Sequence, residues 1–362
     1  MRFPNLDGLR FFAALAVAIA HVEQVSSIFK LPNVYHVRAI AALGNVAVSV
    51  FFVLSGFLIT YLLLAENEKT GTINFYNFYR RRALRILPLY LSICVIAFFV
   101  IPHVSWMSVP GYQPPWTNSF WLSAGLYALL SPHVAESLLP GIPYAGVLWS
   151  VGVEEWFYFI CPALLFFAGR RSATILVSVA LLLVLGRWAP GRLAAFFLML
   201  RFDCLAVGGL FAMLLVYSAE SKRLTELRQM FYARGVQIVV LCMLPLTLVL
   251  MDHIAQAVVF GIFIFNLATN PKSLLSLAHP ILDRLGAISY GMYGYNWIAA
   301  VIAMRVATML FRDTLAASAA TFIGGIVLTL LLAGLSYLAI EKPFLNLKWK
   351  KRERTVPLLV PD

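Results

Sequence analysis

Charged residues are scarce in this sequence. They make up 12% of the 362 residues, whereas hydrophobic residues make up 61%. Soluble proteins average about 25% charged and about 45–50% apolar residues, so the shortage excludes a soluble globular domain. Apolar runs of about twenty residues recur along the chain, and each is long enough to cross a bilayer. The sequence therefore predicts an all-α, polytopic transmembrane helix bundle.

Cysteine is scarce as well. The four cysteines lie within apolar runs, and none has the spacing of metal ligands. We interpret them as packing residues. Their placement argues against a disulfide framework, and no metal is expected.

Lysine and arginine are unevenly distributed, which sets the expected topology. The formal net charge is +12, and about ten spans would place both termini on the side that holds most of the 28 basic residues. Cytoplasmic loops carry such an excess, so both termini are expected in the cytoplasm and no nucleic-acid partner is expected. Residues 1–346 are interpreted as one transmembrane domain, and residues 347–362 as a basic cytoplasmic tail. The spans are expected at about 11–29, 40–64, 86–103, 147–168, 173–188, 193–217, 235–251, 254–270, 288–311 and 318–340.

One segment lacks basic residues altogether. Residues 104–146, called here the aromatic segment, contain no Lys or Arg and are rich in Pro, Trp and Tyr. We expect this segment to fold back over the outer end of the bundle. Trp and Tyr commonly anchor a chain at the membrane interface, and aromatic faces also suit sugar rings. Both interpretations stay open.

The first apolar run begins with charged residues and carries a histidine. Arg10 and His21 are eleven residues apart, about 1100° of helix, so they share a face at roughly 16 Å along the axis. Polar groups at membrane depth usually line a cavity or a path, although an interhelical hydrogen bond is the plainer interpretation. We favour His21 as a general base. Asp7 is expected to orient Arg10 or to cap the helix.

Four arginines, at positions 80, 81, 82 and 85, lie at the expected cytoplasmic mouth of the third span. Arg82 and Arg85 are three residues apart and point the same way on a helix. Tyrosines, Tyr90 among them, interleave with the arginines. Guanidinium forks and aromatic faces suit a ligand that carries phosphates and adenine. A topogenic or lipid-headgroup role is the alternative.

Two more charged sets lie within predicted spans. Glu154 and Glu155 are adjacent near the outer end of the fourth span, so at most one faces a given site. Arg201 and Asp203 lie inside the sixth span, do not face each other, and need partners elsewhere. Ion pairing between helices is the structural alternative for these residues.

Taken in order, these stretches resemble the acyltransferase-3 family of integral membrane O-acyltransferases. The resemblance covers nearly the whole chain. Asn296 departs from it, because many members have a histidine there, and proton transfer is not available to an amide. The matching stretches are Leu6–Arg10 with His21, Phe51–Ile59, Arg82–Tyr90, Trp149–Glu154, Arg201–Asp203, Ser289–Trp297 and Tyr337–Pro343.

The resemblance implies transfer of an acyl group, most often acetyl, from cytoplasmic acyl-CoA to a hydroxyl of a glycan or lipid-linked sugar. Acetyl-CoA is thus the expected donor, and a multi-pass protein of the bacterial inner membrane, in contact with its lipids, is expected. Lipopolysaccharide, exopolysaccharide, peptidoglycan or a macrolide would each fit as acceptor. The short chain, without a hydrolase-like extracytoplasmic domain, favours a one-step enzyme.

The implied site has two parts. CoA is expected at Arg10, Arg82, Arg85 and Tyr90, with its acyl thioester carried through the bundle to His21. His21 would act as general base or transient acyl carrier. Glu154 would orient His21 or bind the acceptor, and Arg201 and Asp203 would have structural or orienting roles.

A glycolipid transporter or flippase is the main alternative, because it shares the polytopic fold and the buried charges. No internal repeat is visible, which weakens an inverted-repeat transporter. A membrane sensor or scaffold is a third class. Binding of acyl-CoA distinguishes the enzyme from the transporter.

Overall fold

The computed structural model describes residues 3–112, 119–250 and 252–347, and within them the chain forms helices and no strand. The predicted all-α class is confirmed. Most of the predicted tail, residues 348–362, lies outside the described residues. The α-helices are α1 (Pro4–Ile28), α2 (Arg38–Thr70), α3 (Phe75–Val95), α4 (Phe120–Ala128), α5 (Pro132–Leu138), α6 (Trp149–Ala168), α7 (Ser172–Gly186), α8 (Arg192–Leu200), α9 (Phe202–Tyr217), α10 (Lys222–Tyr232), α11 (Arg234–Met243), α12 (His253–Thr269), α13 (Pro280–Ala287), α14 (Ser289–Leu310), α15 (Thr314–Ser336) and α16 (Lys342–Asn346).

Six helical stretches in the described residues are long and apolar enough to cross a membrane, or seven if one bent pair is counted as a span. The bent pair joins Lys222–Tyr232 to Arg234–Leu248 at 57°. The protein is thus an integral, multi-pass membrane protein. A count of about ten spans and the cytoplasmic termini stay predictions. The six stretches are Pro4–Ile28, Arg38–Thr70, Phe75–His103, Gly146–Gly186, Phe196–Glu220 and Thr314–Asn346.

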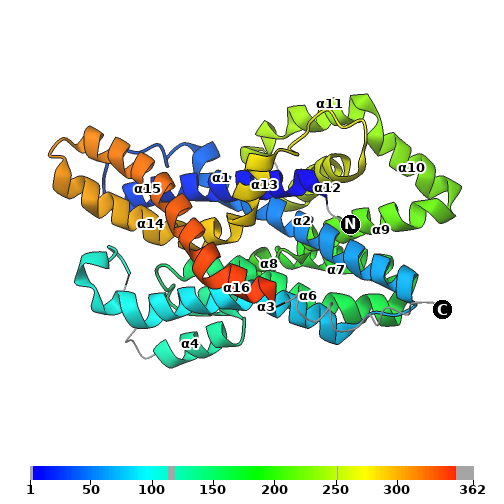
Figure 1. Cartoon of the computed structure of the whole chain (residues 1–362), viewed down its shortest axis with the longest axis horizontal. Helices are drawn as coiled ribbons and strands as arrows, with labels where there is room; N and C mark the ends of the chain where they lie inside the picture. Colours follow the sequence, from blue (N-terminus) through cyan, green and yellow to red (C-terminus); the bar gives the residue numbers. More distant parts are fainter. Residues whose placement is uncertain (1–2, 113–118, 251, 348–362) are drawn as a thin grey trace, which may run out of the picture.

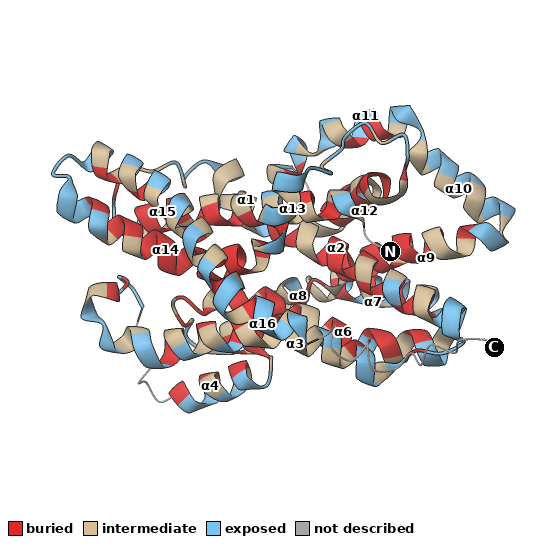
Figure 2. Ribbon diagram, in the orientation of Figure 1, coloured by how far each residue is buried: buried red, intermediate tan, exposed pale blue. Residues whose placement is uncertain are grey.

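Helix α1 is central to the packing. It contacts α2, α13, α14 and α15, while α2 also packs on α6, α9 and α12. In Figure 1, α1, α14 and α15 run along the upper half of the view, and α3, α4 and α6 along the lower half. Buried residues concentrate on α2, α9 and α14, whereas α10 is largely exposed (Figure 2). One face of α1 therefore lies in the interior of the bundle.

Helices α2 and α9 pack with their backbones in contact. A side chain on Gly56 would overlap the carbonyl oxygen of Leu205, and one on Gly208 would overlap that of Val53. Small residues permit this close approach, which is the usual basis of helix association in a bilayer. The contact fixes the register of α2, whose opposite face lines the site.

The aromatic segment folds back onto the helices, as expected. The hydroxyl of Tyr144 donates to the carbonyl oxygen of Met107 within the segment. Arg305 of α14 donates from Nη2 to the carbonyl oxygen of Ser108 at 2.7 Å, and α5 packs on α6 and α8. These contacts hold the segment over one end of α1 and α14.

Candidate functional site

Arg10 and His21 lie on one uninterrupted helix, α1, as the sequence predicted. Pro4 stands in the first turn, where its missing N–H is no loss. Arg10 donates from Nη1 to Oδ1 of Asp7 at 2.9 Å, and each of the two side chains is 19% exposed. Asp7 therefore contacts the guanidinium that we expected it to orient.

Arg10, Arg82 and Arg85 meet in one cavity of about 100 Å³, called here the arginine cavity. Five helices contribute to it: Arg10 comes from α1, Ser55 from α2, Arg82 and Arg85 from α3, Glu154 from α6 and Tyr290 from α14. The structure thus brings together the arginines that the sequence assigned to one ligand.

The arginine cavity is electropositive. Its lining includes three guanidinium groups and one carboxylate, and no ion pair joins Arg82 or Arg85 to a carboxylate in the described part of the chain. The guanidinium of Arg82 lies over the ring of Tyr158 at 5.3 Å from its centroid. Arginine forks without a carboxylate partner favour binding of a phosphate-bearing anion.

Glu154 belongs to this cavity and does not pair with His21. One carboxylate oxygen, Oε1, accepts from the Ser55 hydroxyl at 3.0 Å, and Oε2 accepts from the Tyr158 hydroxyl at 2.8 Å. The expected contact with His21 is therefore not found among the described residues. Glu154 instead partly offsets the charge of Arg10 and Arg82, which lie close enough to interact with it.

His21 lines a second and larger cavity of about 420 Å³, called here the histidine cavity. Gln24, Asn45 and Glu136 supply its other polar side chains, and no Lys or Arg in the described chain lines it. Burial raises the pKa of the Glu136 carboxyl, while hydrogen bonds from Tyr127 and Ile142 oppose the rise. Aromatic rings surround these groups: Tyr35, Tyr112, Tyr144, Trp149, Tyr293 and Trp297.

Asn296 of α14 is the partner of His21. The amide nitrogen of Asn296 donates to the carbonyl oxygens of Met292 and Tyr293, at 3.2 and 2.7 Å. Both amide hydrogens are then used, so Oδ1 faces His21 Nδ1, 2.6 Å away, and can only accept. Nδ1 must therefore carry the proton, which leaves Nε2 with a free lone pair. This is the tautomer that a general base requires.

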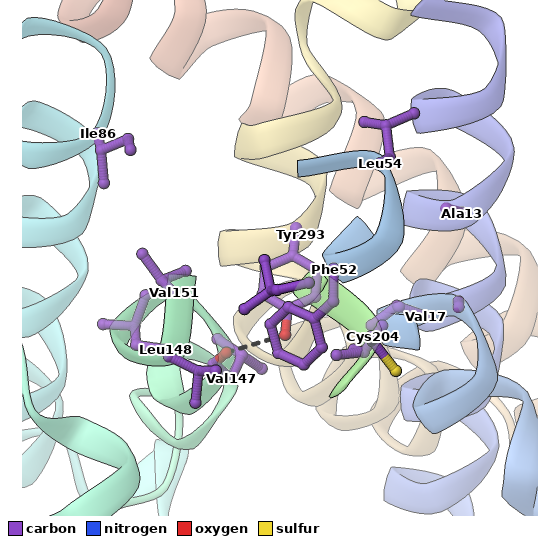
Figure 3. Close-up of a cluster of buried hydrophobic side chains, with 14 of the residues drawn as sticks. Ala13, Val17, Phe52, Leu54, Ile86, Val147, Leu148, Val151, Cys204 and Tyr293 are labelled. Carbon is purple, nitrogen blue, oxygen red and sulfur yellow. Dashed lines mark hydrogen bonds between the residues drawn. The ribbon is translucent and has the colours of Figure 1, made fainter. Parts of the chain in front are cut away.

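Tyr293 stands between the two cavities and lines both of them. Its hydroxyl donates to the carbonyl oxygen of Val147 at 3.0 Å and lies 2.5 Å from the Ser150 hydroxyl. Figure 3 shows the Tyr293 side chain directed towards Val147, in the turn just before α6. Tyr293 thus belongs to the cavities at both ends of the path that we expected from the arginines to His21.

Tyr90 does not reach the arginine cavity. It is fully buried, and its hydroxyl donates to the carbonyl oxygen of Tyr127 at 2.7 Å. Five residues of helix separate Tyr90 from Arg85, a rotation of about 500°, which leaves it about 140° away from that face. Its assignment to CoA is therefore not supported, and it packs against the aromatic segment instead.

Arg201 and Asp203 lie apart from both cavities and each has its own partner. Arg201 donates to the hydroxyl of Ser49, and Asp203 pairs with Arg187 through Oδ2 at 2.5 Å. All of these contacts join neighbouring helices, as a structural role requires. Their proposed orienting role stays a prediction.

Three residues of the site escaped prediction from the sequence. Asn296 departs from the family pattern in the sequence, but nothing in the sequence identifies it as the partner of His21. Tyr293 lies in the same stretch and gave no signal beyond its aromatic character. Glu136 lies in the aromatic segment, whose irregular structure has no periodicity from which to infer a direction. Within the described residues, no group of three His, Cys, Asp or Glu side chains could hold a metal ion.

Known proteins resemble this chain. O-acetyltransferase OatA of Staphylococcus aureus is 31% identical over 170 residues, which cover 46% of this chain and 25% of that protein. Acyltransferase MdmB of Streptomyces mycarofaciens is 32% identical over 164 residues, covering 45% and 39%. Peptidoglycan O-acetyltransferase OatA of Listeria monocytogenes is 28% identical over 181 residues, covering 49% and 27%. The chain therefore spans less than half the length of each of these relatives. No solved structure matches.

A family model described as an acyltransferase domain matches residues 3–338. This range contains both cavities, including Arg10, His21, Arg82 and Arg85. The match is therefore to the whole helical bundle. The chain belongs to the acyltransferase-3 family of membrane acyltransferases.

Proposed function

We propose that this protein transfers an acetyl group from cytoplasmic acetyl-CoA to a hydroxyl of a cell-surface or lipid-linked glycan. One observation carries the proposal: a histidine with a free Nε2 lone pair lines one cavity of the bundle, and an arginine cluster of net positive charge lines the adjoining one. Relatives named O-acetyltransferases support the reaction type. The donor and the acceptor belong to the proposal.

The arginine cavity would bind the donor. Arg10, Arg82 and Arg85 would hold the CoA phosphates by charge-assisted hydrogen bonds. The extended pantetheine arm would then span the roughly 16 Å between Arg10 and His21. Tyr293 lies across this route and would have to turn aside before the thioester meets His21.

The histidine cavity would bind the acceptor. Nε2 of His21 would take the proton of the acceptor hydroxyl as its oxygen attacks the thioester carbonyl carbon. The carbon–sulfur bond would then break, and the departing CoA thiolate would take the proton from the imidazolium. Asn296 Oδ1 would stabilise that imidazolium through Nδ1–H. Every proton and electron pair is thereby accounted for.

Binding of acetyl-CoA to purified protein, measured by calorimetry, tests the donor half. Arg82→Ala and Arg85→Ala should each weaken binding by about tenfold or more, since a hydrogen bond to a charged group contributes about 1.5–3 kcal/mol. Arg81→Ala is the matched control, because Arg81 lies on the same helix but is paired with Glu66 at 3.2 Å outside the cavity. If Arg82→Ala and Arg85→Ala bind acetyl-CoA as tightly as the control Arg81→Ala does, a transporter is the better interpretation. The same holds if the wild type does not bind acetyl-CoA.

A further inference from the structure

Glu136 lines the histidine cavity and comes from α5, a helix of the aromatic segment. Its Oε1 accepts from the Tyr127 hydroxyl at 2.6 Å and from the backbone N–H of Ile142 at 3.3 Å. Oε2 has no hydrogen bond to any residue that the structure describes. One oxygen of the carboxylate is therefore fixed in place, and the other is available to a ligand.

The surroundings of Glu136 keep Oε2 accessible. Gly141 lies beside this oxygen, and a side-chain carbon added there would be 3.0 Å from Oε2. Tyr127, which holds Oε1, is itself held by the hydroxyl of Tyr90, which donates to the Tyr127 carbonyl oxygen at 2.7 Å. A carboxylate supported in this way is preorganised, because its orientation does not have to be set when a ligand binds.

The charge of the histidine cavity limits the class of ligand that it can bind. Glu136 is its one acidic side chain among the described residues, and no Lys or Arg lines it. An acidic sugar would place a second negative charge next to Glu136 with no cation to offset it, which is strongly unfavourable in a buried site. Hydroxyl groups, in contrast, donate readily to a carboxylate. The volume of about 420 Å³ lies in the usual range of about 300–1,000 Å³ for small-molecule sites.

We propose that Glu136 selects the acceptor. Oε2 accepts a hydrogen bond from a ring hydroxyl adjacent to the one that reacts at His21, and the cavity takes hydroxyl-bearing rings that carry no acidic group. This inference rests on the proposed function, since it assigns the histidine cavity to the acceptor. It adds a specificity-determining residue and narrows the class of substrate.

The test uses matched pairs of sugars, methyl glucoside with methyl glucuronide and methyl galactoside with methyl galacturonide. Binding to the full-length protein in nanodiscs is measured by calorimetry without donor, and acetyl transfer from acetyl-CoA is measured by mass spectrometry. The neutral member of each pair should bind at least about tenfold more tightly, the size of one charge-assisted hydrogen bond. Glu136→Gln should raise the KM for the neutral sugar about tenfold, reduce the preference over the uronide to about threefold or less, and leave the KM for acetyl-CoA unchanged.

Two further variants distinguish a specific effect at Glu136 from a loss of binding that is caused by misfolding. Gly141→Ala crowds Oε2 without changing the charge, so it should weaken binding of the neutral sugar without improving that of the uronide. Glu23→Gln is the matched control and should change neither value, because Glu23 accepts from the Val34 N–H at 2.8 Å outside the cavity.

Equal use of both sugars by the wild type, or an unchanged preference in Glu136→Gln, would overturn the inference. Failure of the wild type to bind acetyl-CoA would instead overturn the proposed function. The two failures are distinguishable, because sugar binding is measured without donor.

Discussion

The arginine cavity and the histidine cavity adjoin each other yet have opposite chemistry. The arginine cavity is small, about 100 Å³, and its three guanidinium groups outnumber the single carboxylate Glu154. The histidine cavity is larger, about 420 Å³, with aromatic rings, amides and the carboxylate Glu136. Tyr293 lines both. If the proposed function is correct, this contrast would let one helix, α1, serve an anionic donor in one cavity and a neutral acceptor in the other.

The largest effect is expected from substitution of His21, the proposed general base in the histidine cavity. His21→Ala should lower acetyl transfer by about 10²–10⁴-fold, the usual contribution of a general base. Calorimetric affinity for acetyl-CoA should stay unchanged, because His21 does not line the arginine cavity. His36→Ala, an exposed histidine outside both cavities, is the control. Acetyl transfer by His21→Ala at the wild-type rate would show that His21 is not the general base and that the histidine cavity is not the site of the reaction.

Asn296 should act through His21, as a positioning residue. Asn296→Leu removes the acceptor for Nδ1–H and should lower kcat by about tenfold or more with little change in either KM, since about 1.5–3 kcal/mol is lost per hydrogen bond to a charged group. Asn296→Asp retains an acceptor oxygen and should recover part of the rate. A rise in KM for the acceptor at constant kcat would show instead that Asn296 shapes the cavity.

Tyr293 tests the separation of the two cavities. Tyr293→Phe loses the hydrogen bonds to Val147 and Ser150, so the barrier between the cavities should open more often. Hydrolysis of acetyl-CoA without acceptor should rise by about 2–10-fold, corresponding to about 0.5–1.5 kcal/mol for a neutral hydrogen bond. Tyr295→Phe is the matched control on the same helix, because Tyr295 contacts Ser92 and lines neither cavity. Unchanged hydrolysis in Tyr293→Phe would mean that this residue is not the barrier.

The sequence predicted the arginine cavity better than the histidine cavity, and the reason is geometric. Helical periodicity places Arg82 and Arg85 on one face of one helix, and the expected topology adds Arg10 at the same end of the bundle. All three line the arginine cavity. The same rule, applied to Tyr90, would have excluded it from their face. Glu154 was paired with His21 wrongly because periodicity does not reveal which helices adjoin at which depth.

The histidine cavity depends on contacts that no local pattern encodes. Asn296 and His21 are 275 residues apart, and their contact results from the packing of α1 on α14. Glu136 comes from a short helix in an irregular segment, where side-chain direction is set by hydrogen bonds to Tyr127 and Ile142. Composition predicted the aromatic character of this segment but not the residue that it places in the site.

Acidification tests α5, which carries Glu136 of the histidine cavity and no residue that lines the arginine cavity. His133 of α5 is fully buried, and its two ring nitrogens have no hydrogen-bond partner in the described chain. Burial lowers the pKa of His133 to about 4, from 6.5. Between pH 6.5 and 4, the unfolded state therefore binds a proton at His133 that the folded state does not bind. The contribution of neutral His133 to the free energy of unfolding is complete above pH 6.5 and is lost as the pH falls towards 4.

Acidification should accordingly loosen α5 before the arginine cavity is affected. The loss should be on the order of 2–3 kcal/mol at pH 4, and His133→Phe, which keeps the ring contact with Trp156, should abolish it. Hydrogen exchange of residues Pro132–Leu138 between pH 7 and 4 measures the effect, with His36→Gln as control. Acceptor affinity should fall with pH in the wild type more than acetyl-CoA affinity does, because α5 contributes Glu136 to the histidine cavity and no residue to the arginine cavity. Parallel loss of both affinities would show that the two cavities are coupled more tightly than their separate linings indicate.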